Sequence, residues 1–190
     1  FLVPKFRLDG EGNPGAFNDV RVVSIEHKMG LHASPTCVLS FGDNDDCIGE
    51  LIGAELGGIR AMFTMMNNAR LNVGLQGVQV AEGATQGAVA YALDRVQSAR
   101  AGSPNKESVK IVEHPDVRRM LMRMKAQTQA ARALVYYAAG QVDRANLGDH
   151  AARNRLELVT PLAKAHGTDL GNEVASLGIQ VHGGMGYIEE

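Results

Sequence analysis

The segment with the clearest potential for chemistry is QVHGGMGY at residues 180–187, which places three glycines within four positions. Glycines let the backbone approach a ligand closely, and their free N–H groups can hold an anionic group such as a pyrophosphate. Gly183 and Gly184 are the candidate cradle, and Gln180 could add a side-chain hydrogen bond. The same pattern also suits a glycine-rich helix end followed by a loop, and the residues alone favour that structural explanation. His182 by itself is more typical of a packed or surface histidine than of a base.

Two other polar groups could contact a ligand. Arg95 and Gln97 occur at the expected end of a helix, where they could present donors to a phosphate or nucleotide. A cation at a helix C-terminus is also favoured by the helix dipole, which is a sufficient structural explanation. Asn67 and Arg70 lie about one helical turn apart, so they could face one cleft. An arginine on a solvated face is an equally good alternative.

Several chemistries lack the residues that they need. The chain has no C-x-x-C pair, no Glu-x-x-His pair for a di-iron site, no strand-borne G-x-G-x-x-G and no Walker sequence. Asp43, Asp45 and Asp46 form an acidic cluster, but the remaining positions of a calcium loop are missing, so a solvated turn is the better interpretation. We therefore expect no metal site.

The elements that would position the polar residues divide the chain into two parts. In the first part, short apolar runs alternate with turn formers at roughly ten-residue spacing, which predicts antiparallel strands. Residues 20–25 and 37–41 are the clearest strands, residues 1–6 are strand-like, and residues 9–15 form a loop by composition. Three or four strands are too few for an independent sheet, so residues 1–56 are interpreted as part of a β-domain.

The second part, from residue 57 onward, has a helical period, with apolar residues spaced i, i+3, i+4 and i+7. The first helix is expected to begin after two glycines and to run to Ala99. Residues 101–110 are expected to form a solvent loop, because they contain glycine, serine, proline and asparagine. A second amphipathic helix follows, with Asp116 as a candidate cap.

A third helix is expected at about residues 151–179, after a break marked by Gly148 and Asp149. Pro161 lies inside this helix and should kink or divide it. Long helices joined by short connections favour an antiparallel bundle. The predicted fold class is therefore mainly α, with a helical bundle over residues 57–190 that is preceded by part of an antiparallel β-domain.

Composition narrows the class of protein further. The net charge of −2, without a long basic run, argues against non-specific nucleic-acid binding. Two cysteines are too few for a disulfide framework, which favours a cytoplasmic location. No apolar run approaches the roughly 20 residues that cross a bilayer. Because the chain begins with Phe1 and ends on Glu190 without a terminating signal, we expect both ends to be cuts, so a targeting signal could have been lost.

The order of several motifs carries a family resemblance. In chain order these are FLVPK at residues 1–5, KMG at 28–30 with S-x-T at 34–36, the Ile-Gly pair at 48–49, the Gly-Gly pair at 57–58, DRVQ at 94–97, and QVHGGMGY at 180–187. In this order the motifs resemble the acyl-CoA dehydrogenase family over essentially the whole chain. MMNNAR at 65–70 and the loop after Arg100 are most similar to the longer bacterial 3-methylmercaptopropionyl-CoA dehydrogenase-like branch. Ser98 departs from the family, which usually has a phenylalanine there.

The resemblance implies a flavoprotein that uses FAD to oxidise an acyl-CoA thioester to its 2-enoyl-CoA. By this comparison Arg95 and Gln97 would contact the FAD of a neighbouring subunit, Gln180 with Gly183 and Gly184 would hold its pyrophosphate side, and Asn67 and Arg70 would line the acyl-CoA channel. It also implies a homodimer or homotetramer and an electron-transfer flavoprotein as electron acceptor. Residues 1–56 would belong to the middle β-domain, and residues 57–190 to a C-terminal helical bundle truncated at its end.

No catalytic residue is assigned within the chain. Most family members carry a catalytic glutamate well beyond the glycine run, so the resemblance places the base beyond Glu190. A smaller group carries it on the first helix, where this chain has Ala69. We therefore expect the parent protein to be an enzyme and this part alone to be inactive. The alternatives are a non-catalytic relative with a binding or DNA-protection role, and a plain helical interaction module.

Overall fold

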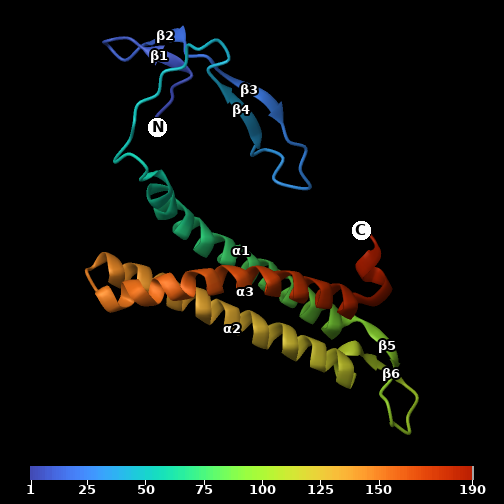
Figure 1. Ribbon diagram of the computed structural model, residues 1–190. Coiled ribbons are helices and arrows are strands. Elements are labelled where there is room, and N and C mark those ends of the chain that lie inside the picture. The colour runs from blue at the N-terminus through green and yellow to red at the C-terminus, as the bar shows by residue number, and fades with distance from the viewer. Residues whose placement is uncertain (190) are drawn as a thin grey trace. The chain divides into compact units, whose positions relative to one another are not determined.

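A computed structural model describes residues 1–189 of the chain. The chain divides into two compact units, Phe1–Met62 and Phe63–Glu190. The first unit contains strands and the second contains most of the helical residues, as Figure 1 shows. The predicted fold class, mainly α with a preceding antiparallel β portion, is confirmed.

The first unit is built from two antiparallel hairpins. Strands β1 and β2 pair with each other, and so do β3 and β4. Asn18 is fully buried and joins separate segments: its side-chain amide donates to the carbonyl oxygens of Pro4 and Ile48, each at 2.8 Å, and its Oδ1 accepts from the Ile48 N–H at 2.9 Å. The strands are β1 (Phe6–Leu8), β2 (Pro14–Phe17), β3 (Val20–Ile25) and β4 (Cys37–Phe41).

The strands expected at residues 20–25 and 37–41 are confirmed as β3 and β4. The strand-like run at residues 1–6 is different, because only Phe6 lies in a strand. Pro4 has no N–H to give to a ladder, and its carbonyl oxygen is taken by the Asn18 side chain instead.

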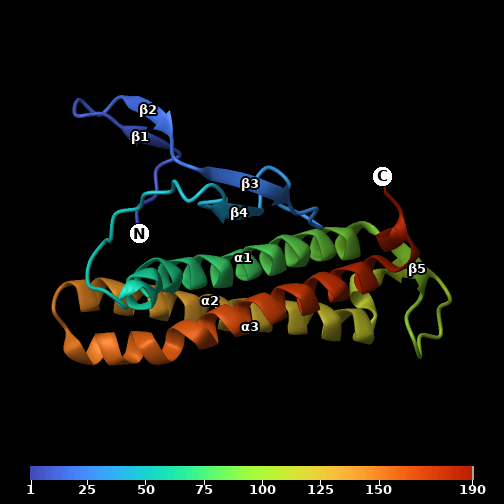
Figure 2. The same cartoon turned by 45° about the horizontal axis from the view of Figure 1, so that its top comes forward.

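The second unit is a bundle of long helices. Helices α1 and α3 run in the same direction, and α2 runs antiparallel to both (Figures 1 and 2). The start of α2 therefore lies at the same end of the bundle as the last residues of α1 and α3. The helices are α1 (Gly58–Asp94), α2 (Pro115–Asn146) and α3 (His150–His182), with short 3-10 turns η1 (Ile111–Glu113) and η2 (Gly183–Tyr187). The predicted helical bundle is confirmed.

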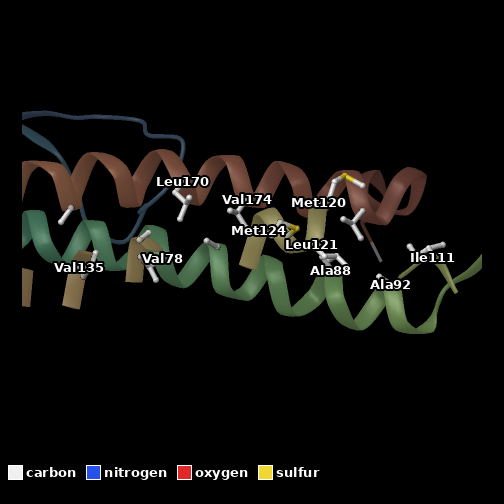
Figure 3. Close-up of a cluster of buried hydrophobic side chains, with 14 of the residues drawn as sticks. Val78, Ala88, Ala92, Ile111, Met120, Leu121, Met124, Val135, Leu170 and Val174 are labelled. Carbon is white, nitrogen blue, oxygen red and sulfur yellow. The ribbon is translucent and has the colours of Figure 1, made fainter. Parts of the chain in front are cut away.

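The bundle core is aliphatic, as expected for a chain without tryptophan. One apolar stripe from each helix meets along the bundle axis, and methionine fills the centre, where Met124 is fully buried (Figure 3). Ion pairs tie the helices outside this core: Arg132 Nη2 lies 2.7 Å from a Glu82 carboxylate oxygen, and Arg123 pairs with Glu173.

Helices α1 and α3 approach so closely that glycine is required at their contact. A Cβ added to Gly77 would lie 2.0 Å from the carbonyl oxygen of Gly167, and one added to Gly167 would lie 2.5 Å from the carbonyl oxygen of Gly74. Gly171 completes the contact, since its Cβ would lie 3.0 Å from Gly77. These obstacles are backbone atoms, so the helices could not accept larger residues without separating.

The end of α1 differs from the prediction. The helix stops at Asp94 rather than Ala99, with a last helical hydrogen bond from the Arg95 N–H to the Tyr91 carbonyl at 2.8 Å. The chain then forms strand β5 (Val96–Ala99), which pairs antiparallel with β6 (Ser108–Lys110). The loop expected at 101–110 is therefore shorter, because its last residues supply the ladder partner of β5.

Helix α3 is continuous through Pro161, so of the two predicted effects of this proline, a kink or a division, the division does not occur. Neighbouring packing outweighs the missing hydrogen bond. Thr160 and Ala163 are buried on either side of the proline, and Gly74 of α1 packs against the Ala163 carbonyl. The buried Thr160 hydroxyl donates to the Leu156 carbonyl at 2.7 Å, which satisfies this side chain within the helix.

The turn between α2 and α3 is where it was expected. Gly148 has a φ of +93°, a conformation that favours glycine, and Asp149 caps α3 by accepting from the Ala152 N–H at 3.0 Å. The candidate cap Asp116 does not cap α2; its carboxylate pairs with Arg119 at 2.7 Å instead. No helix among residues 1–189 is both long enough and apolar enough to span a membrane.

Candidate functional site

An open pocket of about 720 Å³ lies at the end of the bundle where α1 ends, α2 begins and α3 ends. Every one of these elements contributes to it, together with β5, η1 and η2. The pocket brings Arg95 and Gln97 together with Gly183 and Gly184, although the whole of α2 and α3 separates the two pairs in sequence. The lining residues are Tyr91, Arg95, Gln97, Ser98, Ile111, His114, Val117, Val181, His182, Gly183, Gly184, Met185 and Ile188.

The end of α1 supplies the cationic side of the pocket. Arg95 follows the last helical residue and is exposed. Among residues 1–189 no carboxylate forms an ion pair with it, whereas Arg123, Arg132 and Arg144 each have one. Arg95 is therefore a guanidinium that faces the pocket with its donors available.

A bulge in β5 directs two more residues toward the pocket. Val96 pairs with Lys110 and Ala99 with Ser108, so Gln97 and Ser98 together oppose a single residue of β6. Ser98 has a φ of +60°, which is a strained conformation for a residue with a side chain. The bulge explains how consecutive strand residues, Gln97 and Ser98, can both line the same pocket.

The glycines that follow α3 line another side of the pocket. Gly183 has a φ of +61° and ends α3, and its N–H donates to the Gln180 carbonyl. A Cβ added to Gly183 or to Gly184 would meet no atom within 4 Å. Gly186 is different, because its Cβ would lie 2.7 Å from the Ile179 carbonyl oxygen. Gly186 is thus required by packing, while Gly183 and Gly184 leave space at the pocket.

Two histidines flank the pocket, and each is held by a backbone carbonyl. His114 Nε2 lies 2.8 Å from the Gln97 carbonyl oxygen, and His182 Nδ1 lies 2.7 Å from that of Gly178. The His182 ring also stacks on Tyr91, with ring centroids 4.4 Å apart and planes 29° apart.

The sequence does not single out Tyr91 or His114 as lining residues. A signal is present for Tyr91, which lies one helical turn before Arg95. Ser98 stands out in sequence only as a departure from the usual phenylalanine. For His114, which precedes a proline at a helix start, no local pattern points to the pocket.

The remaining predicted residues lie outside this pocket. Gln180 is exposed and does not line it. Asn67 and Arg70 lie near the opposite end of α1, where Arg70 Nη1 is 3.5 Å from Asn67 Oδ1 and its guanidinium lies 5.4 Å from the centre of the Phe63 ring. From Arg70 to Asp94 the helix extends 24 residues, or roughly 36 Å at about 1.5 Å per residue.

The lining of the pocket includes groups that can hold an anion. A guanidinium and a glycine turn are groups that bind phosphates. No aspartate or glutamate is among the lining residues of the described chain, so the pocket has no carboxylate base. No group of three or more potential metal ligands occurs within residues 1–189.

Comparison with known proteins gives a consistent result. The profile of the family described as "Acyl-CoA dehydrogenase, C-terminal domain" matches residues 57–190. The chain is 46% identical over 194 residues to a 3-methylmercaptopropionyl-CoA dehydrogenase of Ruegeria pomeroyi, an alignment that covers 100% of this chain and 32% of that protein. The chain therefore spans about a third of the length of this curated relative.

Solved structures show the same architecture. Butyryl-CoA dehydrogenase from Megasphaera elsdenii aligns with a TM-score of 0.70 and 28% identity over 90% of this chain and 40% of its own. A chain from a structure described as an electron transferring flavoprotein of Acidaminococcus fermentans aligns with a TM-score of 0.69 and 28% identity, over 93% of this chain and 42% of its own.

Proposed function

Because this chain belongs to the acyl-CoA dehydrogenase family, we propose that the protein carrying it is an FAD-dependent enzyme that oxidises an acyl-CoA thioester to its 2-enoyl-CoA. The observation that carries the proposal is the pocket in which Arg95 and Gln97 meet Gly183 and Gly184. The similar proteins are called dehydrogenases or come from a flavoprotein structure, so the non-catalytic alternative is not supported.

The residues present fit a dinucleotide. Arg95 has no carboxylate partner among residues 1–189, and in the same part of the chain a Cβ added to Gly183 or Gly184 would meet no atom within 4 Å. A pyrophosphate placed there would gain charge-assisted hydrogen bonds from the guanidinium and approach the backbone without a Cβ in the way. Gln97 would add a side-chain donor, and Gln180 could reach the outer part of the ligand from its exposed position. When bound, FAD supplies the acceptor for the hydride that leaves the β-carbon of the substrate.

The substrate would be held at the other end of α1. We propose that Asn67 and Arg70 line the channel for the acyl-CoA, since their side chains lie together on the helix. Because roughly 36 Å of helix separates them from the pocket, the two groups cannot surround one reacting carbon atom. The arrangement supports a cofactor that is held by Arg95 of one subunit and serves the substrate of a neighbouring subunit, in a homodimer or homotetramer.

An electron-transfer flavoprotein is proposed as the electron acceptor, in line with the flavoprotein structure from Acidaminococcus fermentans that this chain resembles.

The proposed domains are part of a middle β-domain over residues 1–56 and a C-terminal helical bundle over residues 57–190. A cytoplasmic location is proposed because Cys37 and Cys47 are both unpaired.

The role of this chain in the reaction is therefore binding and orientation. The α-proton of the thioester must leave to a base within hydrogen-bond reach, and the thioester oxygen must be held by donors as negative charge develops on it. No aspartate or glutamate lines the pocket at the bundle end within residues 1–189, so we assign no carboxylate base to this pocket. Its residues would fix the dinucleotide so that the reactive ring is presented to the substrate in one orientation.

The test is to purify the intact protein that contains this chain and to measure FAD binding and reduction. The proposal predicts a yellow protein that loses its colour under anaerobic conditions when acyl-CoA is added, and that releases 2-enoyl-CoA. A colourless protein that takes up no FAD would overturn the proposal.

A further inference from the structure

The His182 side chain is held in a single orientation by two separate contacts. Its Nδ1 lies 2.7 Å from the carbonyl oxygen of Gly178, one turn earlier in α3. Its ring stacks on Tyr91 of α1 with centroids 4.4 Å apart. One contact fixes the position of Nδ1 and the other fixes the plane of the ring, so the direction of Nε2 is also determined.

The same contacts determine which nitrogen carries the proton. A carbonyl oxygen can only accept, so the close approach of Nδ1 requires an N–H on that nitrogen. In a neutral imidazole the other nitrogen is then an acceptor. Among residues 1–189 no donor bonds to Nε2, although His182 lines the pocket. His182 is thus a lining residue of the pocket with an oriented acceptor that no donor among residues 1–189 uses.

We propose that His182 Nε2 accepts a hydrogen bond from a hydroxyl or amino group of the nucleotide beside its pyrophosphate. This inference rests on the proposed function, because it assumes that the pocket holds a dinucleotide. Arg95 and the glycine turn provide donors, which suit phosphate oxygens, whereas an acceptor suits the sugar hydroxyls or the base. His182 therefore complements the anion site and selects a nucleotide over a simple phosphate.

The other titratable or charged groups that line the pocket do not serve the same purpose. Arg95 has donors only. His114 Nε2 approaches the Gln97 carbonyl oxygen, which leaves His114 Nδ1 as an acceptor too, but no ring stack among residues 1–189 fixes the plane of that ring. Tyr91 lies against the face of the His182 ring. Among the titratable groups of the lining, His182 is the one whose second nitrogen is oriented by two contacts.

The test compares three substitutions in the intact protein by FAD titration. His182→Phe keeps an aromatic ring against Tyr91 and removes both nitrogens; His182→Asn keeps a donor near Gly178 and removes the distal acceptor; His182→Gln restores a distal acceptor. We expect FAD affinity to fall about 3- to 10-fold in the Phe and Asn variants, as for one lost hydrogen bond, and to recover to within about 3-fold of wild type in the Gln variant. His166→Phe, at an exposed position of the same helix, should bind FAD like wild type.

Two results would overturn the inference. One is wild-type affinity in His182→Asn, which would limit His182 to its bond with Gly178. The other is an equal loss of FAD affinity in His182→Gln and His182→Asn, which would show that a distal acceptor does not restore binding. Failure of the proposed function is distinguishable from both, because wild-type protein would then bind no FAD.

Discussion

Glycines are used in opposite ways in two regions of the bundle. At the contact of α1 with α3, a Cβ on Gly77 would lie 2.0 Å from the Gly167 carbonyl oxygen. At the end of α3, a Cβ on Gly184 would meet nothing within 4 Å. The first glycine is needed because protein fills the space beside it, and the second leaves space that protein does not fill. This contrast separates glycines that hold the fold from glycines that leave space open beside the chain.

The largest effect on stability should come from adding a methyl group at the contact of α1 with α3. Gly77→Ala should lower the free energy of unfolding of the intact protein by about 3 kcal/mol or more, because the new methyl group meets backbone that cannot rotate away. Urea unfolding followed by helical circular dichroism measures this effect. The matched control is Gly83→Ala in the same helix, where a Cβ meets nothing within 4 Å and alanine should stabilise by up to about 1 kcal/mol. Equal stability of the two variants would contradict the assigned contact.

The next largest effect should come from removing the positive charge that lines the pocket at the end of the bundle. Arg95→Ala should weaken FAD binding by about 10- to 100-fold, the range for a lost charge-assisted hydrogen bond, without changing the unfolding of the FAD-free protein. Arg153→Ala, at an exposed position near the start of α3, serves as the control for net charge. If both arginine variants bind FAD equally well, the pocket is not the pyrophosphate site.

A smaller effect is expected from Gly184→Ala, which tests the open glycine directly. The methyl group has room in the protein, so unfolding of the FAD-free protein should change by less than about 1 kcal/mol. FAD affinity should nevertheless fall about 3- to 10-fold, because the methyl group would occupy space that the ligand needs. Isothermal titration with FAD measures the affinity, and an unchanged value would show that the free space is not ligand space.

The smallest effect should appear at the turn between α2 and α3, far from both regions. The Ala152 N–H, and after it the Arg144 guanidinium, hold the pKa of Asp149 below its ordinary value. A lowered pKa in the folded state means that the stabilisation is present at neutral pH and is lost as the pH falls through the folded pKa. Asp149→Ala should therefore lower the melting temperature by a few degrees near neutral pH and by less in acid.

Asp149→Asn is the control for this pH effect, since it keeps a capping oxygen but cannot titrate. Thermal melts of the FAD-free protein across the acid range check the prediction. A wild-type advantage over Asp149→Ala that increases as the pH falls would contradict the sign. FAD affinity should be unaffected by either substitution, because Asp149 does not line the pocket.

Much of the fold could be predicted from local patterns. The strands at 20–25 and 37–41, the break at Gly148 and Asp149, and the helical bundle all follow from residue periodicity and turn chemistry. Strand β5 could not be predicted, because it exists only through pairing with residues 108–110 and its sequence is compatible with a helix. The continuity of α3 at Pro161 depends on packing against Gly74, which no local pattern reveals.

The candidate site could be predicted in part. Motif order points to Arg95, Gln97, Gly183 and Gly184, and these residues lie in one pocket. Gln180 does not line the pocket, because the helix rotates its side chain toward the surface before the chain turns at Gly183. His114 could not be found from sequence, because its contribution depends on how the start of α2 meets β5, a contact between elements that is visible only in three dimensions.

A structure of the intact protein with FAD bound tests most directly whether the pocket at the end of the bundle holds the pyrophosphate of FAD. We expect phosphate oxygens within hydrogen-bond distance of the Arg95 guanidinium and beside Gly183 and Gly184. FAD phosphates bound elsewhere, with this pocket holding only solvent, would contradict the proposed site.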